Sequence, residues 1–175
     1  MSLDFNALPM FPRSEWCVDV FWRDLEAYIH RDVTGVPPLD LNPDFQRGHV
    51  WTDEQRSRYV EYVLRGGEGG KELLFNCRGW QSVRTKTPGP YQIIDGLQRL
   101  TAVRRFLAGE LRAFGHYRGQ FQGPMQHYLG FRWRMFELTR AEVLQFYLDL
   151  NAGGTPHAES EIERVRALLS KETSS

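Results

Sequence analysis

The chain has 175 residues, of which 41% are hydrophobic, and its 22 basic and 22 acidic side chains leave no net charge at pH 7. This length and composition predict a single domain over residues 1–170 with a disordered tail at residues 171–175. Two isolated cysteines and no membrane-length apolar run argue against a disulfide framework, a cysteine-bound metal or a membrane span, and favour a cytoplasmic location.

The charges are unevenly distributed along the chain. Residues 1–77 carry 8 basic and 13 acidic side chains, residues 78–140 carry 11 and 3, and residues 141–175 carry 3 and 6. The basic middle segment either folds back onto the acidic N-terminal third or contacts nucleic-acid phosphates. In the second case we expect Arg104, Arg105 and Arg112 to bind the nucleic acid, because they would project off the apolar face of a central helix.

The first half of the chain contains two helical patterns and one strand. Apolar residues at helical spacing within "FWRDLEAYIHRD" predict a helix near residues 21–29, and the proline-rich segment that follows should be extended. Thr52 and Gln55 form a capping-box pattern at the start of a helix that should end at Gly66. "KELLFNC" is a predicted strand.

The most informative stretch is "YQIIDGLQRLTAVRRFL", residues 91–107. Residues 91–94 predict a short strand, Asp95 resembles a helix N-cap, and Gln98 stands where a capping box closes. Arg99 falls on the apolar face of the predicted helix, where a cation is costly unless an anion meets it. That anion is either a phosphate bound at the helix N-terminus beside Gly96, or the carboxylate of Asp95.

The last part of the chain begins with an irregular, glycine-rich region. "RMFEL" is then a predicted strand, Thr139 and Glu142 should cap a helix, and "NAGGTP" should turn the chain into a final helix over about residues 156–170. Short strands mixed with helices predict an α+β fold.

Three segments in this order, "LNPDFQRGHVW", "YQIIDGLQRLTAVRRFLAGE" and "FYLDLNAGGTPHAESEI", resemble the DGQQR-motif family. This family is the N-terminal domain of GmrSD-type modification-dependent restriction systems and belongs to the ParB/sulfiredoxin-like superfamily. The resemblance extends from about Trp16 to Arg166. It implies one compact α+β domain in which helices pack around a short mixed sheet.

The resemblance also implies that the domain binds a nucleoside triphosphate (ATP, GTP or CTP), with Mg²⁺ as the accompanying ion, and that many members hydrolyse it. Asp95 and Arg99 match the catalytic positions of the DGQQR signature, in which Leu97 replaces the first glutamine. The residues implied in phosphate binding are Arg47, Gly96, Leu97, Gln98, Arg99, Thr101, Asn151, Gly153, Gly154 and Thr155. We therefore expect Arg47 and residues 151–155 to lie close to Asp95.

Three functions follow from these observations. The leading hypothesis is a nucleotide-binding module, with NTP hydrolysis as its candidate activity, that acts with DNA or with a separate nuclease or effector in restriction, anti-restriction or phage defence. The alternative is a non-catalytic ParB-like DNA-binding or adaptor domain. A metal-dependent nuclease that uses Asp95 with Asp44 or Glu137 is the least favoured, because the sequence shows no acidic cluster with metal-ligand spacing.

Overall fold

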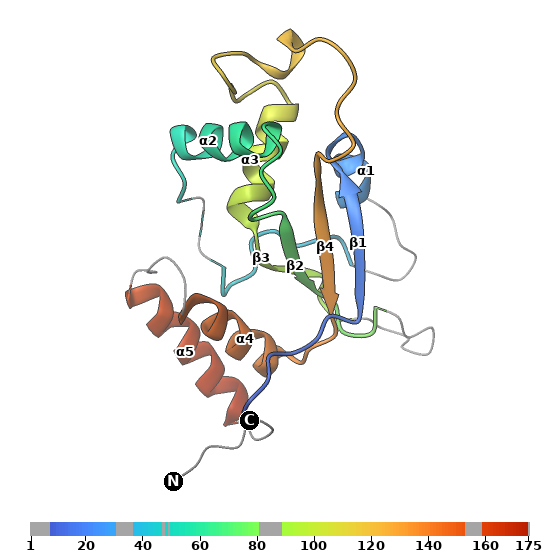
Figure 1. The fold of residues 1–175 in the computed structure, drawn as a ribbon. Helices are drawn as coiled ribbons and strands as arrows, with labels where there is room; N and C mark the ends of the chain where they lie inside the picture. The colour runs from blue at the N-terminus through green and yellow to red at the C-terminus, as the bar shows by residue number, and fades with distance from the viewer. Residues whose placement is uncertain are drawn as a thin grey trace.

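A four-stranded mixed sheet organises the molecule (Figure 1), which we describe from a computed structural model that covers residues 8–30, 37–46, 48, 50–80, 89–152 and 159–174. The strands lie in the order β1-β4-β2-β3. β1 pairs antiparallel with β4, β4 parallel with β2, and β2 antiparallel with β3. The strands span β1 Trp16–Phe21, β2 Glu72–Asn76, β3 Gln92–Asp95 and β4 Gly130–Phe136.

The helices form two groups on the sheet. α2 and α3 lie together at one end of the molecule, and α4 and α5 form a separate pair (Figure 1). The helices span α1 Leu25–Ile29, α2 Asp53–Leu64, α3 Leu97–Leu107, α4 Arg140–Ala152 and α5 Glu159–Thr173. This arrangement confirms the predicted α+β class with helices packed around a short mixed sheet.

Hydrophobic cores cover both faces of the sheet. Leu73 and Phe75 of β2 belong to the larger core with α1, α2 and α3, whereas Leu74 between them belongs to the smaller core with α4 and α5. Successive residues of a strand point to opposite faces, so the continuous apolar run of β2 is buried on both sides. The smaller core leaves part of its face uncovered, and charged residues of β1 and β4 occupy that part.

The capping signals predicted at the starts of α2 and α4 are confirmed. The Thr52 side chain accepts a hydrogen bond from the Gln55 N–H and the Gln55 side chain accepts one from the Thr52 N–H, which completes the capping box of α2. Gly66 follows this helix with a φ of 87°. Thr139 and Glu142 form the same reciprocal pair at the start of α4. These motifs were predictable because all their atoms lie within a few residues of one another.

Three local predictions need correction. Residues 16–21 form strand β1, and Phe21 ends this strand instead of starting a helix. Gly96, with a φ of 100°, is the N-cap residue of α3, and Asp95 is the last residue of β3. The final helix α5 continues to Thr173, so residues 171–173 are helical and do not belong to a disordered tail.

The helices of the described residues show no membrane-spanning character. None of them is both long and apolar enough to cross a bilayer.

Candidate functional site

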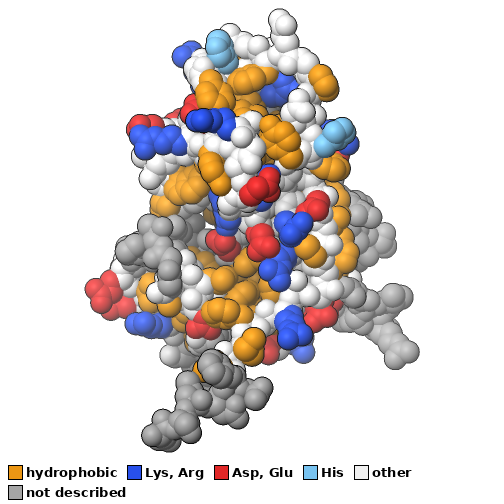
Figure 2. Space-filling model, viewed as in Figure 1, with side chains coloured by type: hydrophobic (Ala, Val, Ile, Leu, Met, Phe, Trp, Pro, Cys, Tyr) orange, Lys and Arg blue, Asp and Glu red, His pale blue; other side chains and the backbone are white. Residues whose placement is uncertain are grey.

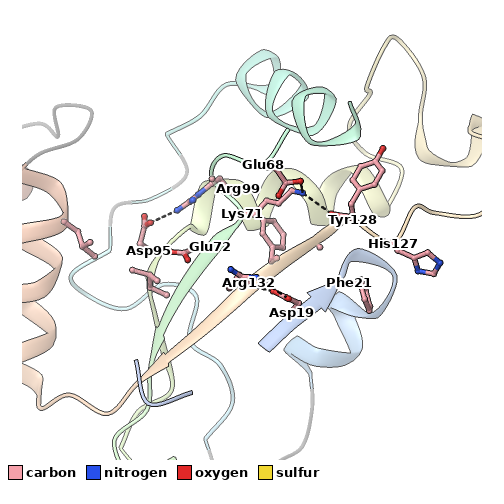
Figure 3. A pocket seen from close by; sticks show the side chains of 15 residues that line it. Asp19, Phe21, Glu68, Lys71, Glu72, Asp95, Arg99, His127, Tyr128 and Arg132 are labelled. Atoms are coloured by element: carbon pink, nitrogen blue, oxygen red, sulfur yellow. Dashed lines mark hydrogen bonds and ion pairs between the residues drawn. The ribbon is translucent and has the colours of Figure 1, made fainter. Parts of the chain in front are cut away.

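A cleft of about 720 Å³ opens on the part of the sheet that α4 and α5 leave uncovered. Its floor consists of residues from β1, β2 and β4 that alternate with core residues, and the end of β3 and the start of α3 form one wall (Figure 3). Figure 2 shows acidic and basic side chains side by side in the middle of this face. The charged residues that line the cleft are Asp19, Glu68, Lys71, Glu72, Asp95, Arg99 and Arg132.

Arg99 and Asp95 meet at one end of the cleft (Figure 3). Arg99 Nη2 donates a hydrogen bond to Asp95 Oδ2 over 2.5 Å, and the Arg99 side chain is 18% exposed against 52% for Asp95. The sequence left two anions open for Arg99, and the structure shows the Asp95 carboxylate in contact with it. The pair lies in the cleft wall, so a ligand in the cleft can reach the guanidinium of Arg99.

Two glycines with positive φ make room for the Arg99 guanidinium. A Cβ atom on Gly70 would lie 3.6 Å from Arg99 Nη1, and a Cβ atom on Gly96 would lie 3.4 Å from Nη2. Tyr59 donates a hydrogen bond from its hydroxyl to the carbonyl of Gly70 and so fixes this loop against α2. Burial raises the pKa of Tyr59 far above its ordinary value, which keeps this hydroxyl protonated as a donor.

The other cations of the cleft also have carboxylate partners. Arg132 pairs with Asp19 across β4 and β1, and Lys71 pairs with Glu68 and donates to the carbonyl of Tyr128. Asp19, Phe21, Lys71, Glu72, His127 and Arg132 were not singled out from the sequence as site residues. Alternating polar residues in "WCVDVF" and "GFRWRMF" were the available signal, because every second residue of an edge or half-covered strand faces away from the core.

Gln98 joins the segment of the first motif to the start of α3. Its side chain, in a residue only 8% exposed, donates to the carbonyl of Gly48 and accepts from the N–H of Trp51. The sequence predicted that Gln98 closes a capping box with Asp95. This prediction is wrong, because the Gln98 side chain bonds residues 48 and 51 instead. Gln46 donates from its side chain to the carbonyl of Ile94, next to Asp95. The segment on both sides of residue 47 is thus bound to the β3–α3 junction.

The predicted phosphate-binding residues divide into some that the structure describes and some that it does not. Arg47, Gly153, Gly154 and Thr155 lie outside the described residues. Asn151 is at the end of α4, where its side chain donates to the carbonyl of Tyr147. Its neighbour Leu150 lines the same cleft as Asp95, so the end of α4 reaches the site.

Leu97 and Thr101 lie away from the Asp95 cleft, on the other side of α3. Both line a second hollow of about 530 Å³ together with Arg104 and Arg105. Leu97 is also buried, with 3% of its surface exposed, so its side chain serves the core. The first turn of α3 therefore lies between the two hollows, and the phosphate-binding residues predicted from the sequence do not all face the same one.

Two of the three arginines predicted to bind nucleic acid, both on α3, are paired with carboxylates. Arg104 donates two hydrogen bonds to Glu26 at 2.6 and 2.9 Å, and Arg105 donates two to Asp53 at 2.5 and 3.1 Å. Arg112 instead lies over the ring of Tyr117 at 4.7 Å. The basic middle segment thus folds back onto the acidic N-terminal third, which is the first of the two interpretations that its charge allowed.

The carboxylates proposed for a metal-dependent nuclease do not gather around Asp95. Asp44 pairs with Arg140, and Glu137 accepts a hydrogen bond from the N–H of Gly79. Among the residues that the structure describes, no three His, Cys, Asp or Glu side chains are grouped as metal ligands. The geometry of the described residues gives this alternative no support.

Comparison with known families gives one match over most of the chain. The model of the "GmrSD restriction endonuclease, N-terminal domain" family matches residues 30–164. This span includes all three motifs, the cleft residues from Glu68 onward and the Asp95–Arg99 pair. Comparisons with curated proteins and with solved structures give no match.

Proposed function

The chain belongs to the GmrSD restriction endonuclease N-terminal domain family, and from this membership we propose that it is the nucleotide-binding module of a restriction system. The cleft at the β3–α3 junction binds the phosphates of a nucleoside triphosphate in this proposal. The family gives the context of DNA restriction, and the proposal adds the ligand and the place where it binds.

One observation carries the proposal: Arg99 is held in the wall of the cleft at the first turn of α3. Gly96 has no side chain to cap this helix, so backbone N–H groups of the first turn need other acceptors. A guanidinium beside a helix N-terminus binds phosphate oxygens through charge-assisted hydrogen bonds. Asp95 keeps Arg99 in position until the phosphate replaces the carboxylate as its partner.

The charges of the cleft predict that the nucleotide binds together with Mg²⁺. Four carboxylates and three cations line the cleft, so a free triphosphate would meet repulsion from the carboxylates. Mg²⁺ would neutralise part of the triphosphate charge, and carboxylate oxygens such as those of Asp95 and Glu72 are ligands that it prefers. Hydrolysis, if the module catalyses it, would use Arg99 to stabilise charge on the phosphoryl oxygens and Asp95 to orient water.

Isothermal titration of the protein with ATP, GTP and CTP, each with and without Mg²⁺, tests the proposal. We expect at least one nucleotide to bind, and to bind more tightly with Mg²⁺ than without it. A phosphate-release assay with the nucleotide that binds then decides between a binding module and an NTPase. No binding heat with any of the three nucleotides would contradict the proposal.

A further inference from the structure

A strained turn follows α3 and presents an aromatic side chain to solvent. Ala113 and His116 exchange two backbone hydrogen bonds of 2.9 and 3.0 Å, which close a two-residue hairpin turn. Its central residues, Phe114 and Gly115, have φ values of 51° and 77°. Such turns favour asparagine, aspartate or glycine, because a residue with a bulky side chain is disfavoured at positive φ.

Phe114 gains little burial in exchange for this conformation. The residue is 47% exposed, while its backbone N–H donates a 2.7 Å hydrogen bond to Glu61 Oε1 of α2. Among the described residues, it is the one non-glycine residue with positive φ. The turn is therefore fixed to α2, and the ring is held outward at a conformational cost that the core does not offset. Residues held in sparsely populated backbone conformations cluster at functional sites.

Further aromatic and cationic side chains lie on the segment of Phe114 and on α2 beside Glu61, to which the Phe114 N–H is bonded. Tyr62 of α2 and Tyr117 are 47% and 39% exposed, and the guanidinium of Arg112 lies over the Tyr117 ring. Figure 2 shows hydrophobic, basic and histidine side chains together at the end of the molecule that this segment forms. We call the surface formed by this turn and the adjoining end of α2 the aromatic tip, and we define it by Tyr62, Arg65, Arg112, Phe114, Tyr117 and Arg118.

The arginines of the aromatic tip differ from those of α3. Within the part of the chain that the structure describes, Arg65, Arg112 and Arg118 form no ion pair with a carboxylate, whereas Arg104 and Arg105 each bind one through two hydrogen bonds. The nearby carboxylate of Glu61 already accepts the hydrogen bond from Phe114. The aromatic tip thus combines exposed rings with cations that have no carboxylate partner among the described residues.

We propose that the aromatic tip binds a nucleic-acid strand, with Phe114 stacked on an unpaired base and Arg65, Arg112 and Arg118 on the adjoining phosphates. Exposed rings set among cations are the combination by which proteins hold single strands, since every base has a face that can stack and every nucleotide carries a phosphate. The surface is separate from the nucleotide cleft. In this proposal the nucleic acid binds at the hairpin turn and not at the paired arginines of α3, where the sequence placed it.

Fluorescence anisotropy with a labelled single-stranded DNA of 20 nucleotides, and with its duplex, tests the proposal. In Phe114→Gly the ring is lost, but glycine suits the positive φ, so we expect a melting temperature close to or above that of the wild type. Affinity for the single strand should fall on the order of tenfold to a hundredfold, the range for losing one stacked base. Phe11→Gly is the matched control, because Phe11 is 61% exposed and packs near Phe146 of α4.

A salt titration tests the arginines independently. Arg112→Gln combined with Arg118→Gln should flatten the slope of log K against log salt by about 1.4, since each single-strand phosphate contact contributes about 0.7. Arg13→Gln combined with Arg166→Gln removes the same charge elsewhere and should leave the slope unchanged. The proposal is overturned if the wild type does not bind DNA, if Phe114→Gly binds as tightly as the wild type, or if both charge variants change the slope equally.

Discussion

Gly96 sets the geometry of the candidate site at the scale of single residues. Its φ of 100° turns the chain from β3 into α3 and brings Asp95 and Arg99 to the same side of the helix start. With Asp95 as the N-cap, Gly96 would be the first helical residue and would have a negative φ. The sequence is compatible with this arrangement and with the observed one, because glycine adopts either sign of φ. The sequence could therefore identify the residues of the pair but could not fix the turn between them.

Replacement of Gly96 should show how closely this turn is packed. A Cβ atom there would lie 2.3 Å from Leu73 Cδ2 in the core, so Gly96→Ala must both adopt positive φ and displace Leu73. We expect a loss of about 2–4 kcal/mol in the free energy of unfolding, measured by urea denaturation. Gly109→Ala is the control, because Gly109 has a φ of 76° but nothing within 4 Å of an added Cβ atom. Equal losses in the two variants would show that the close contact with Leu73 is not costly.

The same comparison applies to Arg99. Its helical position placed it on the apolar face, and burial of a cation required an anion, so the sequence predicted that it has a partner. The structure shows Asp95 as this partner. A local ion pair four residues apart is predictable from spacing, whereas the contacts of Gly70 and Tyr59 around it involve residues 29 and 40 positions away and left no signal in the sequence.

At the scale of elements, ion pairs join α1 and α2 to α3. Hydrogen bonds from Arg104 lower the pKa of Glu26 below its ordinary value, against the opposing effect of partial burial. The folded protein thus binds this proton less readily than the unfolded chain. The pair therefore stabilises the fold above the unfolded pKa of about 4.5, and its contribution disappears as the pH falls through the lower folded pKa.

A double-mutant cycle over pH tests this contact. Glu26→Gln, Arg104→Gln and the double variant should give a coupling free energy of roughly 0.5–1 kcal/mol at pH 7, because both side chains are partly exposed to solvent. The coupling should decrease as the pH falls below about 4.5 and approach zero once the pH lies below the lowered pKa of Glu26 in the folded protein. Urea denaturation at several pH values measures it. A coupling that keeps its size below the pH at which Glu26 is protonated in the folded protein would mean that packing, and not charge, joins the two helices.

The elements that the sequence predicted well are those with local signals. α2 and α4 were recognised from their capping residues, and β2 from its continuous apolar run. β1 was missed because Phe21 matches both the two-residue period of the strand and the helical spacing that continues through Leu25. Antiparallel pairing with β4, more than a hundred residues later in the chain, favours the strand over the helix, and no local pattern carries that information.

At the scale of the whole molecule, one sheet joins the two hydrophobic cores. Adjacent residues of β2 serve different cores, so loss of either core should disturb the same strand. Within the described residues, five ion pairs join the basic middle segment to the acidic N-terminal third: Arg104–Glu26, Arg105–Asp53, Arg132–Asp19, Arg134–Glu72 and Arg140–Asp44. The described part of the chain should therefore unfold as one cooperative unit.

Val165→Ala tests this cooperativity. Val165 of α5 is fully buried in the smaller core, whereas all five tryptophans precede α4 in the sequence. If the molecule unfolds as a single unit, the free energy of unfolding of the variant should fall by roughly 2 kcal/mol. The midpoint of the tryptophan-fluorescence transition should then shift to a lower urea concentration. The control is Val50→Ala, since Val50 is 48% exposed. An unchanged fluorescence midpoint, with earlier loss of helical circular dichroism, would show that α4 and α5 unfold on their own.

The central claim is that the cleft at the β3–α3 junction binds nucleotide phosphates through Arg99, and calorimetric titration of Arg99→Ala tests it most directly. The nucleotide that binds the wild type with Mg²⁺ should bind this variant more weakly by about 1.5–3 kcal/mol, the range for hydrogen bonds to charged groups. Arg166→Ala, which removes an exposed arginine of α5, should bind as the wild type does. Circular dichroism should confirm that both variants are folded. Equal nucleotide affinity of Arg99→Ala and the wild type would contradict the claim.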